Sequence, residues 1–210
     1  MITSYLASLS GALAVRTSRG IVVTMSVQLL EYSSRELPDS LKCQILSFLR
    51  TTWPEDFVGP NRLRTWLSPE SHHPLHLLLV ENGILISHLE IKWKNLDHAG
   101  QTYKLYGLSG VLTYPAFRGE GHASHLVRIG TVRIRASGGD IGMFHCRPAL
   151  RSFYTRAGWI PIDRATTLVG MPSAPVPSEN LMMMLFLSDK AVAHRSDFEI
   201  EPVYFGRDTW

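Results

Sequence analysis

The stretch Gly110-Val111-Leu112-Thr113-Tyr114-Pro115-Ala116-Phe117-Arg118-Gly119-Glu120-Gly121-His122-Ala123-Ser124-His125-Leu126 decides the fold of this chain. An apolar run ends near Thr113, and a tight loop containing Arg118, Gly119 and Gly121 then opens a helical pattern. The first turn of a helix binds anions, because its N–H groups are unpaired and it carries the positive end of the dipole. Glycines let a diphosphate approach the backbone, and a guanidinium adds a fork of donors. The stretch therefore predicts a phosphate-binding turn, and a glycine-assisted turn before an ordinary helix is the alternative.

The loop departs from two phosphate-binding motifs. It is not a P-loop, because no Gly-Lys-Ser/Thr follows its glycines. It is not the dinucleotide fingerprint either, because Ser124 stands where the third glycine would be. The function of the loop therefore has to be inferred from its neighbours.

The flanking sequence predicts a strand meander followed by a crossover. Strand-like runs cover residues 75–81, 84–93 and 102–113, and Asn82-Gly83 between the first two is a strong hairpin signal. A helical stripe then precedes a strand at 140–146, with small or apolar residues at helical spacing: Ala123, Leu126, Val127, Gly130 and Ile134. This strand–helix–strand unit predicts a parallel strand pair.

The other segments complete an α/β fold. We expect an opening strand at 27–32, helices at 37–50, 61–67 and 147–156, a longer turn at 96–101, a strand at 159–162, a proline-rich loop at 171–177 and a last core strand at 181–187. The strands before the crossover are antiparallel. The fold class is therefore a mixed, mostly antiparallel sheet with helices on both faces.

Composition indicates one soluble globular domain. The chain has 210 residues, of which 45% are hydrophobic and 19% are charged, and its formal net charge is +3. That charge is too small to indicate nucleic-acid binding, and no apolar run reaches the ~18 residues of a membrane span. Cys43 and Cys146 lie far apart and fit no disulfide or zinc pattern, which predicts a reducing, cytoplasmic location.

Residues 1–24 differ from the rest of the chain. They are rich in Ser, Ala and Leu, and no acidic residue precedes Glu31. Arg16 and Arg19 follow the apolar stretch instead of preceding it, unlike the order in a secretory signal; a transit peptide stays open. We expect an N-terminal extension, dispensable or disordered, and one domain at 25–210, with Met25 as an alternative start.

No metal site is expected. His122 and His125 are three residues apart on the helix that follows the loop, but the sequence offers no third ligand, so a solvated surface is the simpler interpretation. Cys146 follows His145, and we expect it to be a small core residue and not a nucleophile.

Two motifs together resemble those of the GNAT acetyltransferases. The first is Arg118-x-x-Gly121-x-Ala123 between a strand and a helix. The second is a helix with a tyrosine ahead of a glycine–aromatic pair, Ala149-Leu150-Arg151-Ser152-Phe153-Tyr154-Thr155-Arg156-Ala157-Gly158-Trp159. The resemblance covers the chain from about residue 27 to its end. It implies a GNAT-type fold with a splayed parallel strand pair, and acetyl-CoA as the co-substrate.

The resemblance also implies roles for the matching residues. Co-substrate binding falls to the strand end, the loop and the start of the helix: Val111, Leu112, Thr113, Arg118, Gly119, Glu120, Gly121, His122, Ala123 and Ser124. A bulge in the strand would separate it from the strand at 141–146. The Val111 amide would polarise the acetyl carbonyl, and Tyr154 would protonate the leaving thiolate. Core packing is the alternative for Tyr154.

Within the superfamily the chain is most similar to aminoglycoside 2'-N-acetyltransferases. The likeness rests on Glu55-Asp56-Phe57, on the run that ends in Trp159-Ile160-Pro161, and on Gly206-Arg207-Asp208-Thr209-Trp210. It implies that Asp56, Asp208 and the carboxylate of Trp210 face a cationic acceptor. Ser109 departs from the pattern, because that family has a glutamate there that relays the proton of the amine. Either another carboxylate, with Glu90 as the candidate, takes this role or the acceptor differs.

The sequence thus predicts an acetyl-CoA-dependent N-acetyltransferase. Its acceptor would be a small cationic molecule with a primary amine, such as an amino sugar or a polyamine, and the amine would attack the thioester directly. A non-catalytic CoA-binding or cation-binding module is the alternative that Ser109 motivates. A nucleic-acid-binding domain would need a longer basic strip than Lys92-Trp93-Lys94. No nucleic-acid or membrane partner is expected, and the sequence allows a homodimer.

Overall fold

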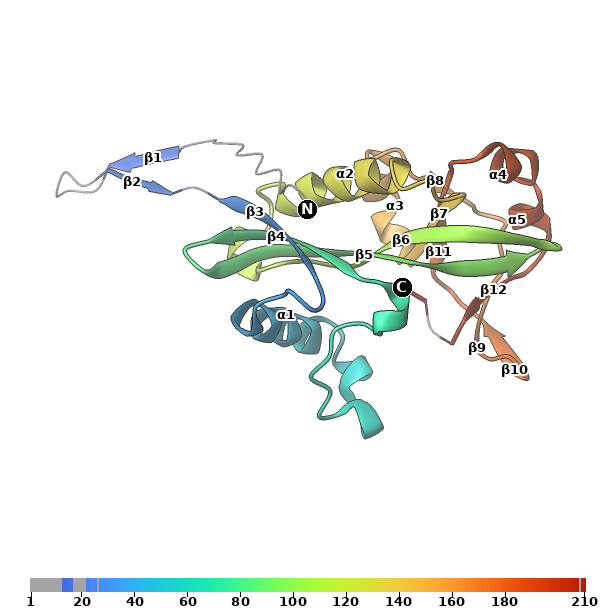
Figure 1. Ribbon diagram of the computed structural model, residues 1–210, viewed down its shortest axis with the longest axis horizontal. Helices are drawn as coiled ribbons and strands as arrows, with labels where there is room; N and C mark the ends of the chain where they lie inside the picture. The colour runs from blue at the N-terminus through green and yellow to red at the C-terminus, as the bar shows by residue number, and fades with distance from the viewer. Residues whose placement is uncertain (1–12, 17–21, 26, 208) are drawn as a thin grey trace.

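A seven-stranded sheet runs through the structure, a computed structural model that describes residues 13–16, 22–25, 27–207 and 209–210 (Figure 1). In order across the sheet the strands are β3 (Gln28–Ser33), β4 (Leu75–Glu81), β5 (Ile84–His98), β6 (Gln101–Thr113), β7 (Ile141–Cys146), β11 (Leu181–Phe186) and β8 (Ile160–Pro161). Neighbouring strands are antiparallel except β6 and β7, which are parallel. The expected mixed, mostly antiparallel sheet is confirmed.

Helices cover both faces of this sheet, because each has one apolar stripe to bury. α1 (Asp39–Thr52) lies below the sheet in Figure 1 and buries Leu41, Ile45, Leu46 and Leu49. α2 (His122–Arg135) lies above it and buries its stripe against residues of β4, β5 and β6. Tyr154 on α3 (Arg151–Thr155) belongs to the same core cluster as the stripe of α2.

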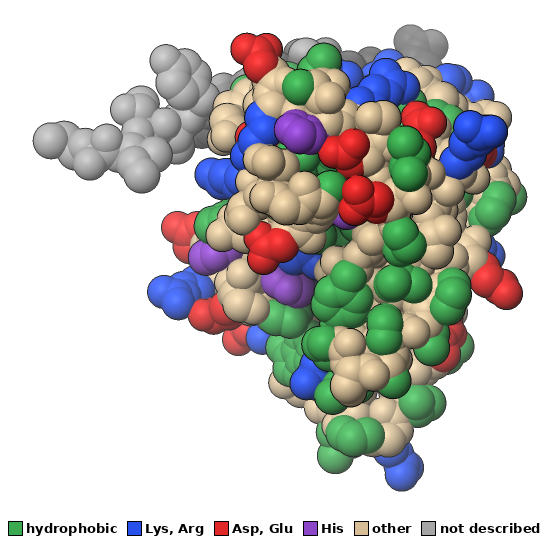
Figure 2. All heavy atoms as spheres, turned by 90° about the vertical axis from the view of Figure 1, so that its right-hand side faces the viewer, with side chains coloured by type: hydrophobic (Ala, Val, Ile, Leu, Met, Phe, Trp, Pro, Cys, Tyr) green, Lys and Arg blue, Asp and Glu red, His purple; other side chains and the backbone are tan. Residues whose placement is uncertain are grey.

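The C-terminal part of the chain forms a smaller sheet and a third core cluster. β9 (Thr167–Met171) lies between β10 (Ala174–Pro177) and β12 (Val203–Gly206), and α4 (Asp189–Ala193) and α5 (Asp197–Ile200) precede β12. Phe198 and Phe205 pack with Tyr103 of β6 in this cluster. Figure 2 looks onto this end of the molecule: charged side chains of both signs mix over its upper part, and hydrophobic ones gather lower down.

β10 corrects the proline-rich loop expected at 171–177. Pro175 and Pro177 lie in a strand that pairs with β9. Proline is tolerated in an edge strand, because half of the N–H groups there have no partner strand, and β10 is the edge of its sheet. Turn-forming residues alone therefore gave the wrong assignment.

Two further expectations need correction. Within the described chain no α-helix forms at 61–67; the 3₁₀ turns Pro54–Phe57 and Gly59–Asn61 occupy the preceding stretch, and similar turns lie at Glu70–His72, Pro115–Phe117 and Pro148–Leu150. The turn expected at 96–101 contracts to Ala99-Gly100, whose φ angles are +48° and +72°. β5 and β6 are correspondingly longer than predicted.

The N-terminal extension is described only in part. β1 (Leu13–Arg16) and β2 (Val22–Met25) pair antiparallel in a two-stranded sheet of their own. Most of the extension expected at 1–24, namely residues 1–12 and 17–21, lies outside the described residues. None of the helices in the described ranges combines the length and the apolar character needed to cross a bilayer.

Candidate active site

β6 and β7 pair over only a small part of their length. Registered pairs join Leu105 to Ile141 and Tyr106 to Gly142, although β6 runs on to Thr113 and β7 to Cys146. Beyond these pairs the strands share no further register among the described residues. We call the resulting gap between the two strand ends the split.

A bulge in β6 accounts for the divergence. Ser109 pairs with Glu90 and Leu112 pairs with His88, so two residues of β6 oppose one residue of β5. The first of the two is Gly110, whose φ of +56° lies in the left-handed region that favours glycine. A bulge bends and twists its strand, which turns the end of β6 away from β7.

Trp210 lies in the split. Its backbone oxygen accepts a hydrogen bond from the N–H of His145 at 3.0 Å, and its indole Nε1 donates to the carbonyl of Met143 at 3.2 Å. Carrying the parallel register of the two strands forward places His145 level with Ser109. Glycine at 107 permits this approach, because a Cβ on Gly107 would lie 2.6 Å from the indole Nε1.

The loop at the open end of the split leads directly into α2. Gly119 and Gly121 have φ angles of +91° and +83°, and Gly121 is the N-cap residue of α2. No side chain in the described part of the chain caps this end, so the first-turn N–H groups can meet a ligand. Arg118 ties the loop to the strand, since its Nε donates to the carbonyl of Thr113 at 3.2 Å. The structure thus brings residues 111–113, 118–121 and 122–124 together at one end of the split.

Tyr154 is almost buried beneath α2. Only 6% of the surface of Tyr154 is exposed. Its ring contacts the Phe144 ring edge to face, with 4.5 Å between the ring centroids. Burial raises the pKa of its hydroxyl, which keeps the group protonated.

Cys146 is buried at the end of β7, and burial raises the pKa of its thiol to about 11. A thiol with this pKa holds little thiolate at neutral pH, as expected for a core residue.

Of the two aspartates expected to face the acceptor, the structure describes only Asp56. Asp56 is exposed on the 3₁₀ turn Pro54–Phe57, and Asp208 lies outside the described residues. Burial lowers the pKa of Arg64, while the charges of Asp56 and Glu90 oppose that change, so both acids lie near this guanidinium. The charge on this side of the sheet is therefore mixed.

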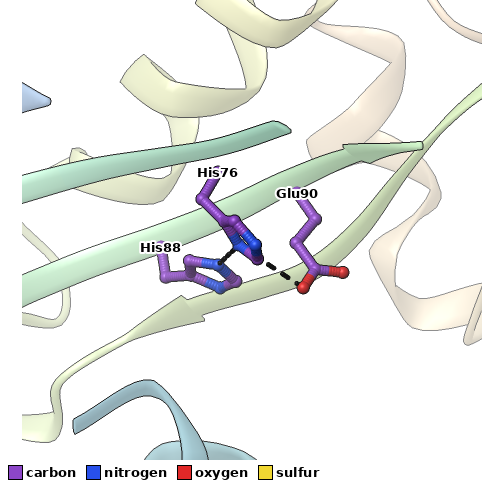
Figure 3. Close-up of side chains that lie close together, drawn as sticks. All are labelled: His76, His88 and Glu90. Carbon is purple, nitrogen blue, oxygen red and sulfur yellow. Dashed lines mark hydrogen bonds and ion pairs between the residues drawn. The ribbon is translucent and has the colours of Figure 1, made fainter. Parts of the chain in front are cut away.

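A buried polar cluster lies beside the bulge, and Glu90 is its only member that the sequence made a candidate for the site. It comprises His76 on β4 and His88, Glu90 and Lys92 on β5, with exposed fractions of 0%, 0%, 3% and 8%. His76 Nδ1 lies 3.1 Å from His88 Nε2 and 3.5 Å from Glu90 Oε1. Figure 3 shows His76, His88 and Glu90 pointing toward one another from neighbouring strands.

Opposite charges keep Glu90 ionised although it is buried. Lys92 Nζ lies 3.3 Å from Glu90 Oε2, and Ser68 Oγ donates to the same oxygen at 2.7 Å. Burial by itself would raise the pKa of Glu90, but Lys92, the hydrogen bond from Ser68 and, in the acid range where they are protonated, the two histidines lower it to about 2. Burial lowers the pKa of His88 to about 4, so this ring is neutral at neutral pH.

The periodicity of β5 is a signal that could have identified this cluster. Every second residue from 88 to 94 is ionisable, in the order His88, Glu90, Lys92 and Lys94. Alternate residues of a strand share one face, and Leu89 and Ile91 between them enter the core under α2. An ionisable row on one face of an otherwise apolar strand indicates a functional or structural polar site.

Comparisons with known proteins agree with this architecture. Residues 29–162 match the sequence profile of the family described as acetyltransferase (GNAT) domain, and no curated protein matches the chain. An acyl-CoA N-acyltransferase from Pseudomonas aeruginosa is 17% identical, with 76% of this chain and 99% of that chain covered and a TM-score of 0.51. A GNAT-family acetyltransferase from Staphylococcus aureus is 14% identical, with coverages of 78% and 100% and a TM-score of 0.53.

One similar structure is much longer. A probable N-acyltransferase from Enterococcus faecalis is 14% identical over 68% of this chain, with a TM-score of 0.51, and the match spans 33% of that chain. At these identities the likeness concerns the fold.

We expect the free energy of unfolding to fall as the pH drops from about 6.5 to 4. Burial lowers the pKa of both His88 and His145 to about 4 in the folded protein, whereas an unfolded histidine titrates near ~6.5. Between these values the unfolded chain binds more protons, so stability rises with pH. Glu90 adds a further loss only below ~4.3, because its folded pKa is the lower one.

Urea titrations at pH 6.5 and pH 4.5 measure this dependence. The variant His88→Asn removes one of the imidazoles whose pKa is lowered by burial, so its stability should depend less on pH than that of the wild type. Equal stability of the wild-type protein at the two pH values would contradict the neutral, buried state of these histidines.

Proposed function

The chain belongs to the GNAT acetyltransferase family, and we propose that it transfers an acetyl group from acetyl-CoA to the primary amine of a small acceptor. The observation that carries the proposal is the split, with the N-terminus of α2 at its open end. An extended pantetheine arm can pair with backbone groups there as an added strand would. The diphosphate then meets the unpaired N–H groups of the helix.

Co-substrate binding follows from the backbone of the loop. The N–H groups of residues 119–124 would hold the diphosphate, the Arg118 guanidinium would add donors, and residues 111–113 would pair with the pantetheine arm. A Cβ on Gly119 or Gly121 would meet nothing within 4 Å. Glycine is therefore required at these two positions by its positive φ, and the space around them stays open for a ligand.

The chemistry is a direct acyl transfer. The amine nitrogen attacks the thioester carbon, the C–S bond breaks, and the sulfur of CoA receives a proton from Tyr154. The nitrogen releases one proton to water as it becomes an amide, and Tyr154 regains its proton from water. The N–H of Val111 would stabilise the negative charge that develops on the carbonyl oxygen, a contribution worth ~10²–10³ in rate at comparable sites. Burial raises the pKa of Tyr154, so the hydroxyl is protonated before the reaction but is a weaker acid than an exposed tyrosine; its position in the motif, and not its pKa, supports the role of donor.

Among the described residues, no strong base lies close to Ser109 to accept the proton of the amine. Glu90 pairs with Ser109 across the bulge, but a carboxylate with a pKa of about 2 is a weak proton acceptor at neutral pH. Glu90 is therefore not assigned as the base, and its ion pair with Lys92 makes it part of the buried network beside the bulge. The amine then loses its proton to water before it attacks.

The acceptor is proposed to be cationic, an amino sugar or a polyamine. The exposed Asp56 supports this choice, and Trp210 in the split lies where an acceptor would approach the thioester.

Thiol release from acetyl-CoA across a panel of amines tests the proposal. The panel contains aminoglycosides, polyamines, amino acids and peptides, together with simple monoamines of matched pKa that carry no second charged group. We expect aminoglycosides or polyamines to give the highest kcat/KM. Binding of CoA without thiol release for any amine would instead support the non-catalytic module, and a preference for anionic amines would contradict the acceptor class.

Gly121→Glu tests the diphosphate site. The carboxylate would stand at the first turn of α2, where it repels a diphosphate, and the side chain is strained at a φ of +83°. We expect no detectable acetyl-CoA binding by calorimetry. Gly138→Glu is the matched control, because Gly138 has a φ of +69° and open space around it but lies beyond the other end of α2. Equal affinities in the two variants would refute the site.

Tyr154→Phe tests the proton donor. The variant keeps the ring that packs against Phe144, so acetyl-CoA affinity should hold while kcat falls by ~10²-fold or more. Tyr103→Phe is the control, because Tyr103 is fully buried and its hydroxyl has no hydrogen-bond partner among the described residues. Equal losses of affinity and turnover in Tyr154→Phe would indicate packing instead.

A further inference from the structure

A side chain of β5 holds the carbonyl of Gly110 at the bulge. The register shift takes Gly110 out of the ladder with β5, and His88 Nδ1 lies 2.8 Å from its oxygen. A carbonyl oxygen can only accept, so His88 Nδ1 carries a proton and donates it. From the residue before His88, Ser87 Oγ donates to the carbonyl of Leu112 at 2.6 Å. Side chains of β5 therefore hold β6 on both sides of Val111.

The same geometry fixes the protons of both histidines in the cluster. A neutral imidazole has one protonated nitrogen, so His88 Nε2 accepts, and His76 Nδ1 at 3.1 Å donates to it. His76 Nε2 then accepts from Ser34 Oγ at 3.0 Å. Burial lowers the pKa of each ring, which keeps both neutral. The donors thus run in one direction, from Ser34 through the two rings to Gly110.

A hydrogen bond to the Gly110 carbonyl also orients the next N–H. In a trans peptide the C=O and N–H bonds point in opposite directions, and the described chain has no cis peptide. Because the carbonyl is directed at the His88 ring, the N–H of Val111 is directed away from that ring. Gly110 cannot fix this orientation alone, since glycine is the most flexible residue.

The cluster also offers the donor set of a metal site. His76, His88 and Glu90 place one ligand atom each within 4.8 Å of one another. Two features favour the hydrogen-bonded arrangement over a bound cation. First, His76 Nδ1 and His88 Nε2 are joined by a hydrogen bond of 3.1 Å, so neither nitrogen has a lone pair free for a metal. Second, Lys92 neutralises Glu90 and would repel a cation beside it.

We propose that His88 is a positioning residue that aims the Val111 N–H at the thioester carbonyl, and that His76 and Ser34 fix the tautomer in which it does so. The proposal rests on the function assigned above, in which that N–H is the oxyanion donor. His88 itself touches neither the co-substrate nor the acceptor.

The infrared carbonyl stretch of bound acetyl-CoA, labelled with ¹³C at the thioester carbon, measures the hydrogen bond from Val111. We expect a shift to lower frequency in the wild-type protein and loss of the shift in His88→Leu. The kcat of that variant should fall by ~10–100-fold. The dissociation constant of CoA, which has no acetyl carbonyl, should stay the same.

Two further variants separate positioning from stability. His88→Asn retains a donor, because the side-chain amide nitrogen of asparagine stands where histidine has Nδ1, so it should restore the frequency shift and most of kcat. Ser87→Ala removes a buried hydrogen bond to the neighbouring carbonyl of Leu112, so it should cost stability while the frequency shift remains. A shift that is lost equally in Ser87→Ala would overturn the specific role of His88.

The tautomer of His88 can be measured in the wild-type protein without co-substrate, so this test holds even if the His88→Leu variant does not fold. Long-range ¹H–¹⁵N spectra of the wild-type protein should show His88 protonated at Nδ1 and bare at Nε2. The opposite tautomer overturns the inference, as does stoichiometric Zn²⁺ binding that requires His76 and His88. A wild-type frequency shift that persists in His88→Leu overturns this inference alone, whereas no shift in the wild type contradicts the proposed function.

Discussion

Backbone pairing between β6 and β7 stops after two residue pairs because β6 carries an extra residue at its bulge, and the candidate site is arranged around that interruption. The chain leaves β6 at Thr113, so the loop and the start of α2 necessarily lie at the wide end of the gap. Within the split, the backbone oxygen of Trp210 accepts the hydrogen bond from the N–H of His145 that a neighbouring strand would otherwise accept. The connectivity thus places an uncapped helix N-terminus and unpaired strand edges side by side.

Polar groups are buried beside the bulge because each has a partner there. A buried charge or imidazole without a partner is costly, but Glu90 contacts Lys92 and Ser68, and the two histidines bind each other. Such networks rigidify their surroundings when every member is satisfied. Here the network holds the bulge of β6, where Gly110 by itself would leave the backbone flexible.

Local sequence signals predict most of the fold and the glycine-containing loop that leads into α2. The Asn82-Gly83 turn, the helical stripe of α2 and the Arg118–Ala123 pattern each act over a few residues, and each was recognised. The contact between His76 and His88 depends on the register of two strands, and the contact of Trp210 with His145 joins residues far apart in the chain. Neither contact leaves a local pattern. The prolines of β10 predict a loop from local sequence alone, because proline is tolerated in a strand only where that strand lies at the edge of its sheet.

The split also gives the sheet two open edges in its interior. An unpaired strand edge is a template on which another chain can add a strand, the usual first step toward aggregation. Trp210 covers one rung of β7, and an extended ligand would cover the rest. Since a ligand that binds only the folded state stabilises it in proportion to the logarithm of its concentration, the supply of co-substrate would govern the solubility and lifetime of the folded chain as well as its turnover.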